Sequence, residues 1–100
     1  MIAMEIEVED GRVHVALRGE LDADNAPTFL QRVNAAHEAY ADVEIGIGNL
    51  EFIDSSGLSA LLKLRDTVIA GGGSFAVTGP TPAVRRVFEI AGLLDAFGLS

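Results

Sequence analysis

Apolar and polar residues alternate along the first part of the chain. The alternating apolar positions are Ile6, Val8, Val13, Val15 and Leu17. A period of two is typical of half-buried β-strands. Asp10 and Gly11 stand between the two alternating runs and form a strong signal for a tight turn. The pattern therefore predicts a β-hairpin whose second strand ends near Arg18, followed by a loop over residues 19–24.

Two later stretches repeat their apolar residues at helical spacing. In the first, Asn25 can cap a helix that has Pro27 in its first turn. The predicted inner face of this helix consists of Phe29, Leu30, Val33, His37 and Tyr40. In the second stretch, the residues that recur at helical spacing are Leu58, Leu61, Leu62, Arg65, Val68 and Ile69. Three glycines at 71–73 end this second helix.

The remaining pattern completes an alternating order of strands and helices. Strands are expected at about 43–47 and 74–78, and a third helix is expected at 83–91 after the turn at 79–82. The order β-β-α-β-α-β-α predicts one α/β domain over residues 1–100. Its sheet is expected to be mixed, with four or five strands and with helices packed mainly on one face. The pattern leaves the state of residues 93–100 open.

The most informative segment is the junction between the third strand and the second helix. It contains Asp54, Ser55, Ser56 and Gly57, after Phe52 and Ile53 have returned to the apolar layer. The free backbone N–H groups and the positive dipole end of a helix N-terminus favour an anion. A phosphate attached to one of these serines would therefore be accepted there. A helix cap, for which Ser and Asp are also the usual residues, explains the same pattern.

Composition narrows the possible functions. The chain has no cysteine, which excludes disulfides and thiol nucleophiles. The absence of a long apolar run and of a basic leader predicts a cytoplasmic protein without membrane insertion. A net charge of −8 argues against direct binding of nucleic acid. Residues 1–54 hold 12 acidic and 3 basic residues, which would suit a basic protein partner.

No arrangement in the sequence indicates catalysis, a cofactor or a metal site. His14 is expected at a strand surface and His37 on a helix, and neither is predicted to act as a base for a serine. Asp22, Asp24 and Asp54 are isolated loop acids without the spacing of a calcium loop. The chain is therefore not expected to be an enzyme.

Three segments together resemble a known family. They are residues 52–58 (FIDSSGL), residues 19–22 (GELD) and residues 82–93 (PAVRRVFEIAGL). In this order and spacing they are similar to the STAS domain, and specifically to the bacterial anti-sigma factor antagonists. The resemblance implies that the unphosphorylated protein binds an anti-sigma factor that is also a serine kinase, and so releases a sigma factor. It also implies that this kinase uses ATP to phosphorylate the protein, which ends the binding, and that a PP2C-type phosphatase reverses the modification.

The resemblance also assigns roles to individual residues. Ser55 corresponds to the phosphorylated serine of the family, and Ser56 would then cap the helix. The expected partner-binding residues are Asp22, Asp54, Ser55, Ser56, Gly57 and Leu58. One position departs from the family pattern, because Gly46 stands where an Asp or Asn is usual in the preceding strand. If that side chain assists phosphorylation, the switch would be weakened here.

Two other functions remain open at the level of sequence. A STAS subunit of another assembly, such as a lipid-transport complex with an ATPase, would dock constitutively through the same helix face. A sensor of a small ligand or nucleotide would instead use the anion-favouring end of the second helix. Phosphorylation of Ser55 distinguishes the antagonist from both.

Overall fold

The first two strands form the hairpin that the alternating pattern predicts. A computed structural model describes residues 1–99 of the chain. Strand β1 (Ile2–Glu9) pairs antiparallel with β2 (Arg12–Leu21), and Glu9 lies opposite Arg12. Asp10 and Gly11 make the turn with φ angles of 49° and 75°. Two successive positive φ angles are what a type I′ hairpin turn requires, so the Asp-Gly pair fixes the register of the hairpin.

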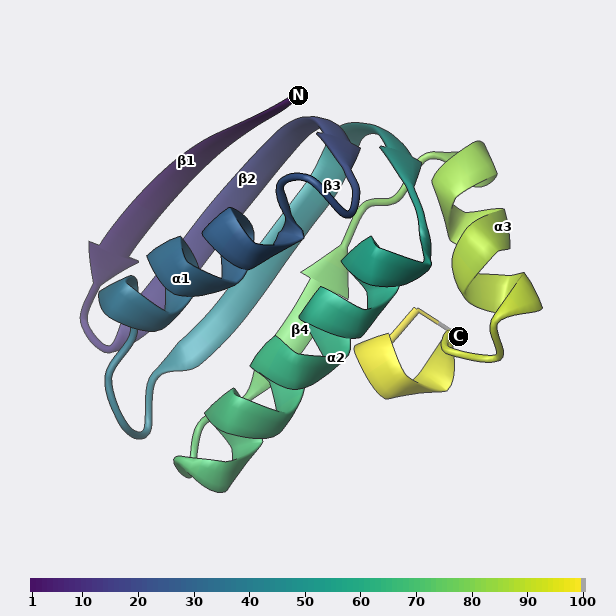
Figure 1. Cartoon of the computed structure of the whole chain (residues 1–100). Coiled ribbons are helices and arrows are strands. Elements are labelled where there is room, and N and C mark those ends of the chain that lie inside the picture. Colours follow the sequence, from purple (N-terminus) through teal and green to yellow (C-terminus); the bar gives the residue numbers. More distant parts are fainter. Residues whose placement is uncertain (100) are drawn as a thin grey trace.

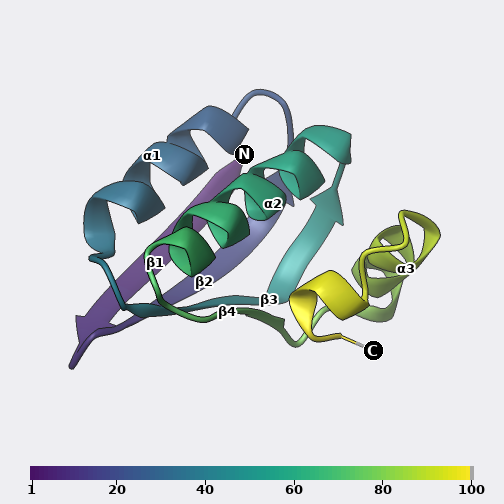
Figure 2. The same ribbon diagram turned by 90° about the horizontal axis from the view of Figure 1, so that it is seen from below.

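The remaining strand pairs are parallel, and a helix connects the two strands of each pair. Strand β3 (Asp42–Ile53) pairs parallel with β2, and β4 (Phe75–Thr78) pairs parallel with β3, giving the order β1-β2-β3-β4. Helix α1 (Ala26–Ala36) connects β2 to β3, and α2 (Ser55–Ala70) connects β3 to β4 (Figure 1). Both helices cover the same face of the sheet (Figure 2). The predicted mixed sheet is confirmed, with four strands.

The core lies between this face of the sheet and the two helices. Alternate residues of the central strands are buried there, namely Val13, Val15 and Leu17 of β2 and Val43, Ile45 and Ile47 of β3. Phe29 and Val33 of α1 and Leu61 and Leu64 of α2 pack onto them and are fully buried. Burial of such apolar surface is the main driving force that joins the layers.

The C-terminal segment closes one end of this core. Helix α3 (Pro82–Ile90) begins at Thr81, whose Oγ1 accepts a hydrogen bond of 3.2 Å from the backbone N–H of Val84. Residues Asp95–Phe97 then form a short 3₁₀-helix. The ring of Phe97 is fully buried and meets Phe88 edge to face, with centroids 5.4 Å apart. Of the tail that the sequence left open, residues 93–99 therefore pack into or against the core, and residue 100 lies outside the described residues.

Two strands are longer than predicted. Strand β2 continues to Leu21 instead of ending at Arg18, and β3 reaches Ile53 instead of Ile47. The reason is tertiary, because the two strands pair with each other along these extensions, with Leu21 opposite Ile53. The predicted loop over residues 19–24 is correspondingly reduced to the residues after Leu21.

Helix α1 is shorter than its apolar spacing suggests. It ends at Ala36, so that His37 is the C-cap and not a member of the helix. Tyr40, which was expected on the inner face, is 81% exposed and has a φ of 65°. Its backbone N–H donates a hydrogen bond of 2.9 Å to the carbonyl of Gly71 beyond the end of α2. This contact between distant segments, and not the helical period, fixes the position of Tyr40.

Candidate functional site

Strand β3 passes into α2 at residues 54–58, a segment that we call the α2 corner. Asp54 is extended, with φ −111° and ψ −173°, and it is the N-cap of α2. Its Oδ1 accepts a hydrogen bond of 3.0 Å from the backbone N–H of Gly57. Its own N–H donates to the carbonyl of Leu21, 3.3 Å away, at the end of β2. Asp54 therefore ties the first turn of α2 to the sheet.

The prediction that Ser56 caps the helix is wrong. Because α2 begins at Ser55, Ser56 occupies the second helical position, where it cannot be the cap. The side chains of both serines make no hydrogen bond to any group within residues 1–99. Ser55 is exposed and Ser56 is half-buried. The Ser55 hydroxyl is thus open to solvent at the positive end of a 16-residue helix.

The capping role of Asp54 can be tested by its effect on stability. Asp54→Ala is expected to lower the free energy of unfolding by about 0.5–2 kcal/mol, because the Gly57 N–H loses its acceptor. Ser56→Ala is the matched control and should change it by less than about 0.5 kcal/mol. Urea denaturation of the two variants measures both values. A larger loss for Ser56→Ala than for Asp54→Ala would contradict this assignment.

Gly57 and Leu58 form the buried side of the α2 corner. A Cβ atom placed on Gly57 would lie 2.7 Å from the carbonyl oxygen of Leu21 and 2.7 Å from Cγ1 of Ile53. The absence of a side chain at residue 57 therefore allows α2 to approach the ends of β2 and β3. Leu58 is only 8% exposed. Both residues lie beneath the surface on which Ser55 is exposed.

Asp22 belongs to a second hydrogen-bonded turn beside the α2 corner. Its Oδ1 accepts hydrogen bonds from the backbone N–H groups of Asp24 at 3.0 Å and Asn25 at 3.2 Å. Asn25 stands at the N-cap position of α1 but does not cap it with its side chain. Its Nδ2 instead donates to the carbonyl of Glu20 at 2.8 Å, and its Oδ1 accepts from the N–H of Asp22 at 3.0 Å. These bonds hold Asp22 in a fixed position after β2.

A groove of about 440 Å³ lies between the N-terminal parts of α1 and α2. Small side chains form one wall, and three serines of α2 form the other. The residues that line it are Ala23, Ala26, Pro27, Leu30, Ser55, Ser56, Ser59, Ala60 and Lys63. Lys63 is the only lysine of the chain and lies two turns beyond Ser55 on α2. Ser55 therefore lies at a recess and not on a flat face.

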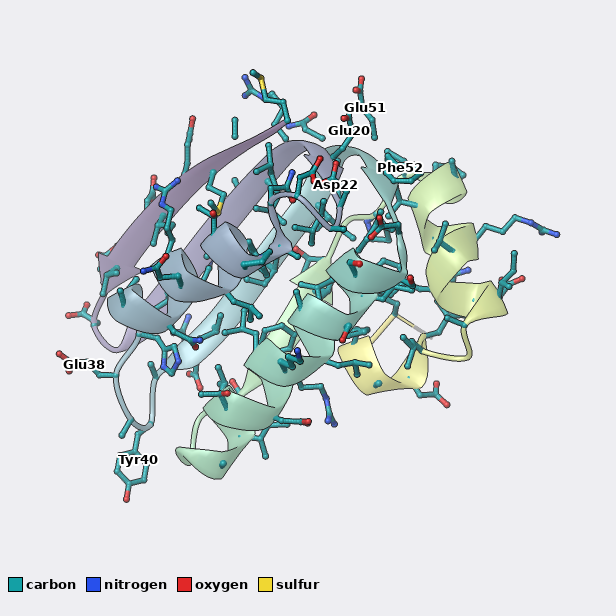
Figure 3. All side chains as sticks on the ribbon, in the orientation of Figure 1. Glu20, Asp22, Glu38, Tyr40, Glu51 and Phe52 are labelled. Carbon is teal, nitrogen blue, oxygen red and sulfur yellow. The ribbon has the colours of Figure 1, made fainter. Side chains whose placement is uncertain are left out.

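The end of the sheet that carries Ser55 is strongly acidic. Residues 19–24 and 50–55 lie at this end, together with the N-terminal ammonium of Met1, which is 3.3 Å from Oε1 of Glu20. Their acidic residues are Glu20, Asp22, Asp24, Glu51 and Asp54. Glu20, Asp22 and Glu51 gather at the ends of β2 and β3, whereas Glu38 and Tyr40 lie at the opposite end of the molecule (Figure 3). Part of the excess of acidic residues within residues 1–54 thus lies around the α2 corner.

The histidines and loop acids form no group that could hold a metal ion within residues 1–99. No three His, Asp or Glu side chains of this part of the chain could hold a metal ion together. Nδ1 of His14 lies 3.9 Å from Oε1 of Glu44 on the exposed face of the sheet. His37 follows the end of α1, and neither histidine lines the groove beside Ser55. None of the helices within residues 1–99 has the length and apolar surface needed to cross a membrane.

Comparison with known proteins identifies the family to which the chain belongs. The model of the STAS domain matches residues 3–100. This chain belongs to the STAS domain family. The match includes every strand and helix described above, together with the α2 corner.

Relatives of this STAS domain include several anti-sigma factor antagonists. The anti-sigma-B factor antagonist of Bacillus subtilis is 26% identical over 99 residues, which span 99% of this chain and 91% of that protein. A crystal structure of an anti-sigma factor antagonist from Mycobacterium paratuberculosis has a TM-score of 0.83 at 30% identity, covering 97% of this chain and 83% of that one. Bacillus SpoIIAA in its phosphorylated form has a TM-score of 0.72 at 26% identity, covering 91% and 85%.

Gly46 lies apart from the α2 corner of this STAS domain. It stands between the buried residues Ile45 and Ile47, so a side chain at this position would point to the face that α1 and α2 do not cover. The nearest atoms to an added Cβ are the carbonyl oxygen of Val15 at 3.7 Å and Oγ1 of Thr78 at 3.9 Å. The structure therefore leaves room for a side chain there, on the opposite face from α2.

Two features of the site differ from the sequence-based expectations or lie outside them. Phe52, which was predicted in the apolar layer, is 50% exposed. A strict alternation continued from Ile45 and Ile47 places Ile53 inward and Phe52 outward, so the error was to put two successive apolar residues on one face. The groove between α1 and α2 depends on how two helices lie side by side, and no local pattern of residues signals it.

Proposed function

We propose that this STAS domain is an anti-sigma factor antagonist that is switched by phosphorylation of Ser55. The unphosphorylated form binds an anti-sigma factor that is also a serine kinase, and this binding releases a sigma factor. The kinase supplies ATP and phosphorylates Ser55, which ends the binding. A PP2C-type phosphatase restores the active form. The domain, residues 1–100, acts in the cytoplasm as a binding module and itself catalyses no reaction.

The observation that carries this proposal is the exposure of the Ser55 hydroxyl at the first position of α2. A kinase needs access to a hydroxyl that is not engaged in the fold, and Ser55 offers one. Asp54, and not a serine, caps the helix, so modification of Ser55 leaves the cap in place. Relatives named as anti-sigma factor antagonists, one of them solved in a phosphorylated form, support the same assignment.

The charge balance at the α2 corner suits such a switch. A phosphate adds about −1.5 to −2 charges. Repulsion by the neighbouring Asp54 carboxylate costs a few kcal/mol at an effective dielectric of about 20, and the helix N-terminus offsets up to ~2 kcal/mol of it. The fold should therefore survive modification. A partner that covers Ser55 would have to desolvate the phosphate, and a loss of only ~4 kcal/mol lowers affinity a thousandfold.

The acidic surface around Ser55 favours a protein partner over a nucleic acid. The end of the sheet around Ser55 carries five acidic residues, of which Glu20 is paired with the N-terminal ammonium. Such a surface repels the phosphates of DNA and attracts a basic protein surface. The proposed partners are therefore proteins, the anti-sigma factor kinase and the phosphatase, without direct contact of this domain with DNA.

Phosphorylation assays with site variants test the proposal. The anti-sigma factor kinase is recovered by affinity capture from native lysate, purified, and incubated with Mg-ATP and the wild type, Ser55→Ala or Ser56→Ala. Mass spectrometry is expected to locate phosphate on Ser55 of the wild type and of Ser56→Ala, and none on Ser55→Ala. Phosphate on Ser56, or on neither serine when the kinase is active, would contradict the assignment. Stable copurification with a membrane ATPase instead would favour constitutive docking.

A further inference from the structure

Strand β3 contains two irregularities, and the second lies four residues before Ser55. In the pairing of β2 with β3, Gly19 lies opposite Leu50 and the next residue, Glu20, lies opposite Phe52. Glu51 is therefore an extra residue without a partner of its own in β2. An extra residue of this kind is a β-bulge, and bulges commonly redirect a side chain next to a functional site.

This bulge changes which face of the strand Phe52 occupies. In a regular strand, residues 50 and 52 share one face. Here Leu50 is fully buried and Ile53 is 2% exposed, whereas Phe52 is 50% exposed and Glu51 is also exposed. Strand β4 pairs only with residues 43–46 of β3, so it does not flank this part of the strand. The bulge thus puts Phe52 on the opposite face from Leu50 and keeps Ile53 in the core.

A single exposed apolar residue needs no functional explanation by itself. The residues around Phe52, however, indicate a function for its exposure. Glu20 lies opposite Phe52 in the ladder, and Glu51 precedes it. Figure 3 shows these acids together with Asp22 and Phe52 at the same end of the molecule. An aromatic side chain within an acidic rim is complementary to an apolar pocket within a basic rim.

We infer that Phe52 is the apolar anchor of the partner-docking surface, and that Glu20 and Glu51 select a partner with a basic rim around an apolar pocket. This inference rests on the proposed function, since the partner it specifies is the anti-sigma factor kinase. Aromatic residues are enriched in protein interfaces, and a few buried anchors carry most of the binding energy. The acidic rim disfavours anionic lipid and nucleic acid as the occupant.

The location of Phe52 also explains how one phosphate could end the binding. Only Ile53 and Asp54 separate Phe52 from Ser55, and both residues lie at the same end of the sheet. A partner that buries the aromatic ring also covers the α2 corner. Phosphorylation would therefore place a doubly charged group at the edge of the apolar contact.

Binding kinetics of matched variants test the inference. The purified anti-sigma factor kinase of the phosphorylation assay is the probe, and binding is measured without ATP. Phe52→Ala is expected to weaken binding about tenfold or more, mainly through faster dissociation. Ile69→Ala is the control, because Ile69 is 47% exposed near the opposite end of α2. It should change affinity by less than about twofold.

Charge reversal tests the acidic rim separately. Glu51→Lys is expected to slow association about threefold or more at low salt, and the difference should shrink at high salt. Glu38→Lys changes the net charge equally at the opposite end of the molecule (Figure 3) and should slow association much less. Equal effects of the two reversals would show that only net charge matters and would overturn the proposed role of the rim.

The outcomes separate this inference from the proposed function. If the kinase phosphorylates Ser55 but binds Phe52→Ala as tightly as the wild type, the anchor is wrong and the switch stands. If binding depends on Phe52 while Ser55 is never phosphorylated, the docking surface stands and the switch fails. If no anti-sigma factor binds the wild type, both are wrong. Circular dichroism of each variant ensures that a loss of binding is not a loss of fold.

Discussion

Ser55→Asp is expected to weaken binding of the anti-sigma factor at least tenfold while leaving the fold intact. A tenfold loss requires only about 1.4 kcal/mol, which is small compared with the cost of burying an unpaired carboxylate in an interface. The exposed position at the start of α2 tolerates a carboxylate in the free protein, because the helix dipole favours a negative charge there. The melting temperature should therefore stay within about 4 °C of the wild type.

Two controls separate charge at this position from other effects. Ser55→Asn has nearly the same size as Ser55→Asp without the charge, and should bind more tightly than Ser55→Asp. Asn34→Asp adds one negative charge at an exposed position of α1 and should leave binding nearly unchanged. Titration calorimetry with the purified anti-sigma factor gives the affinities. Wild-type affinity of Ser55→Asp, or unfolding of that variant, would contradict the prediction.

Gly57→Val should have the largest effect on stability, a loss of at least about 2 kcal/mol in the free energy of unfolding. The added Cβ would lie 2.7 Å from the carbonyl oxygen of Leu21, which also accepts the hydrogen bond from Asp54. Because this oxygen belongs to the backbone of the sheet, it cannot move aside as a flexible side chain would. Overpacking of this kind forces shifts in a close-packed core.

Gly46→Val provides the same chemical change where the structure has space. The nearest atoms to the added Cβ are at 3.7 Å and 3.9 Å, and Val is favoured in strands. This variant should therefore be neutral or slightly stabilised. Thermal melting followed by circular dichroism compares the two. A melting temperature of Gly57→Val equal to that of the wild type would refute the packing argument.

Packing, and not backbone conformation, requires the glycine at residue 57. Gly57 is not among the glycines with positive φ and lies within the first turn of α2. A glycine is required because an added Cβ would lie 2.7 Å from Cγ1 of Ile53 and 2.7 Å from the carbonyl oxygen of Leu21. Leu21 belongs to β2, which is distant from Gly57 in the sequence, so the local sequence does not indicate that contact.

Much of the fold was accessible from the sequence because its signals are local. The Asp10-Gly11 turn fixed the hairpin, and helical spacing followed by glycines located α2 and its end. The position of Ser55 at the start of that helix followed from the same spacing. A period of two or of 3.6 residues depends only on the conformation of the segment itself.

The sequence by itself therefore determined the order of strands and helices, the hairpin turn and the place of the serines at the start of α2. Only the tertiary structure decided that Asp54 rather than Ser56 caps the helix, that β2 and β3 extend to Leu21 and Ile53, and that Leu50 lies in the core. The extension of the strands and the burial of Leu50 arise from pairing between strands that are about thirty residues apart. Because each extra residue in a ladder moves the following side chains to the other face, alternation alone could not place Leu50, which lies between the two irregularities of β3.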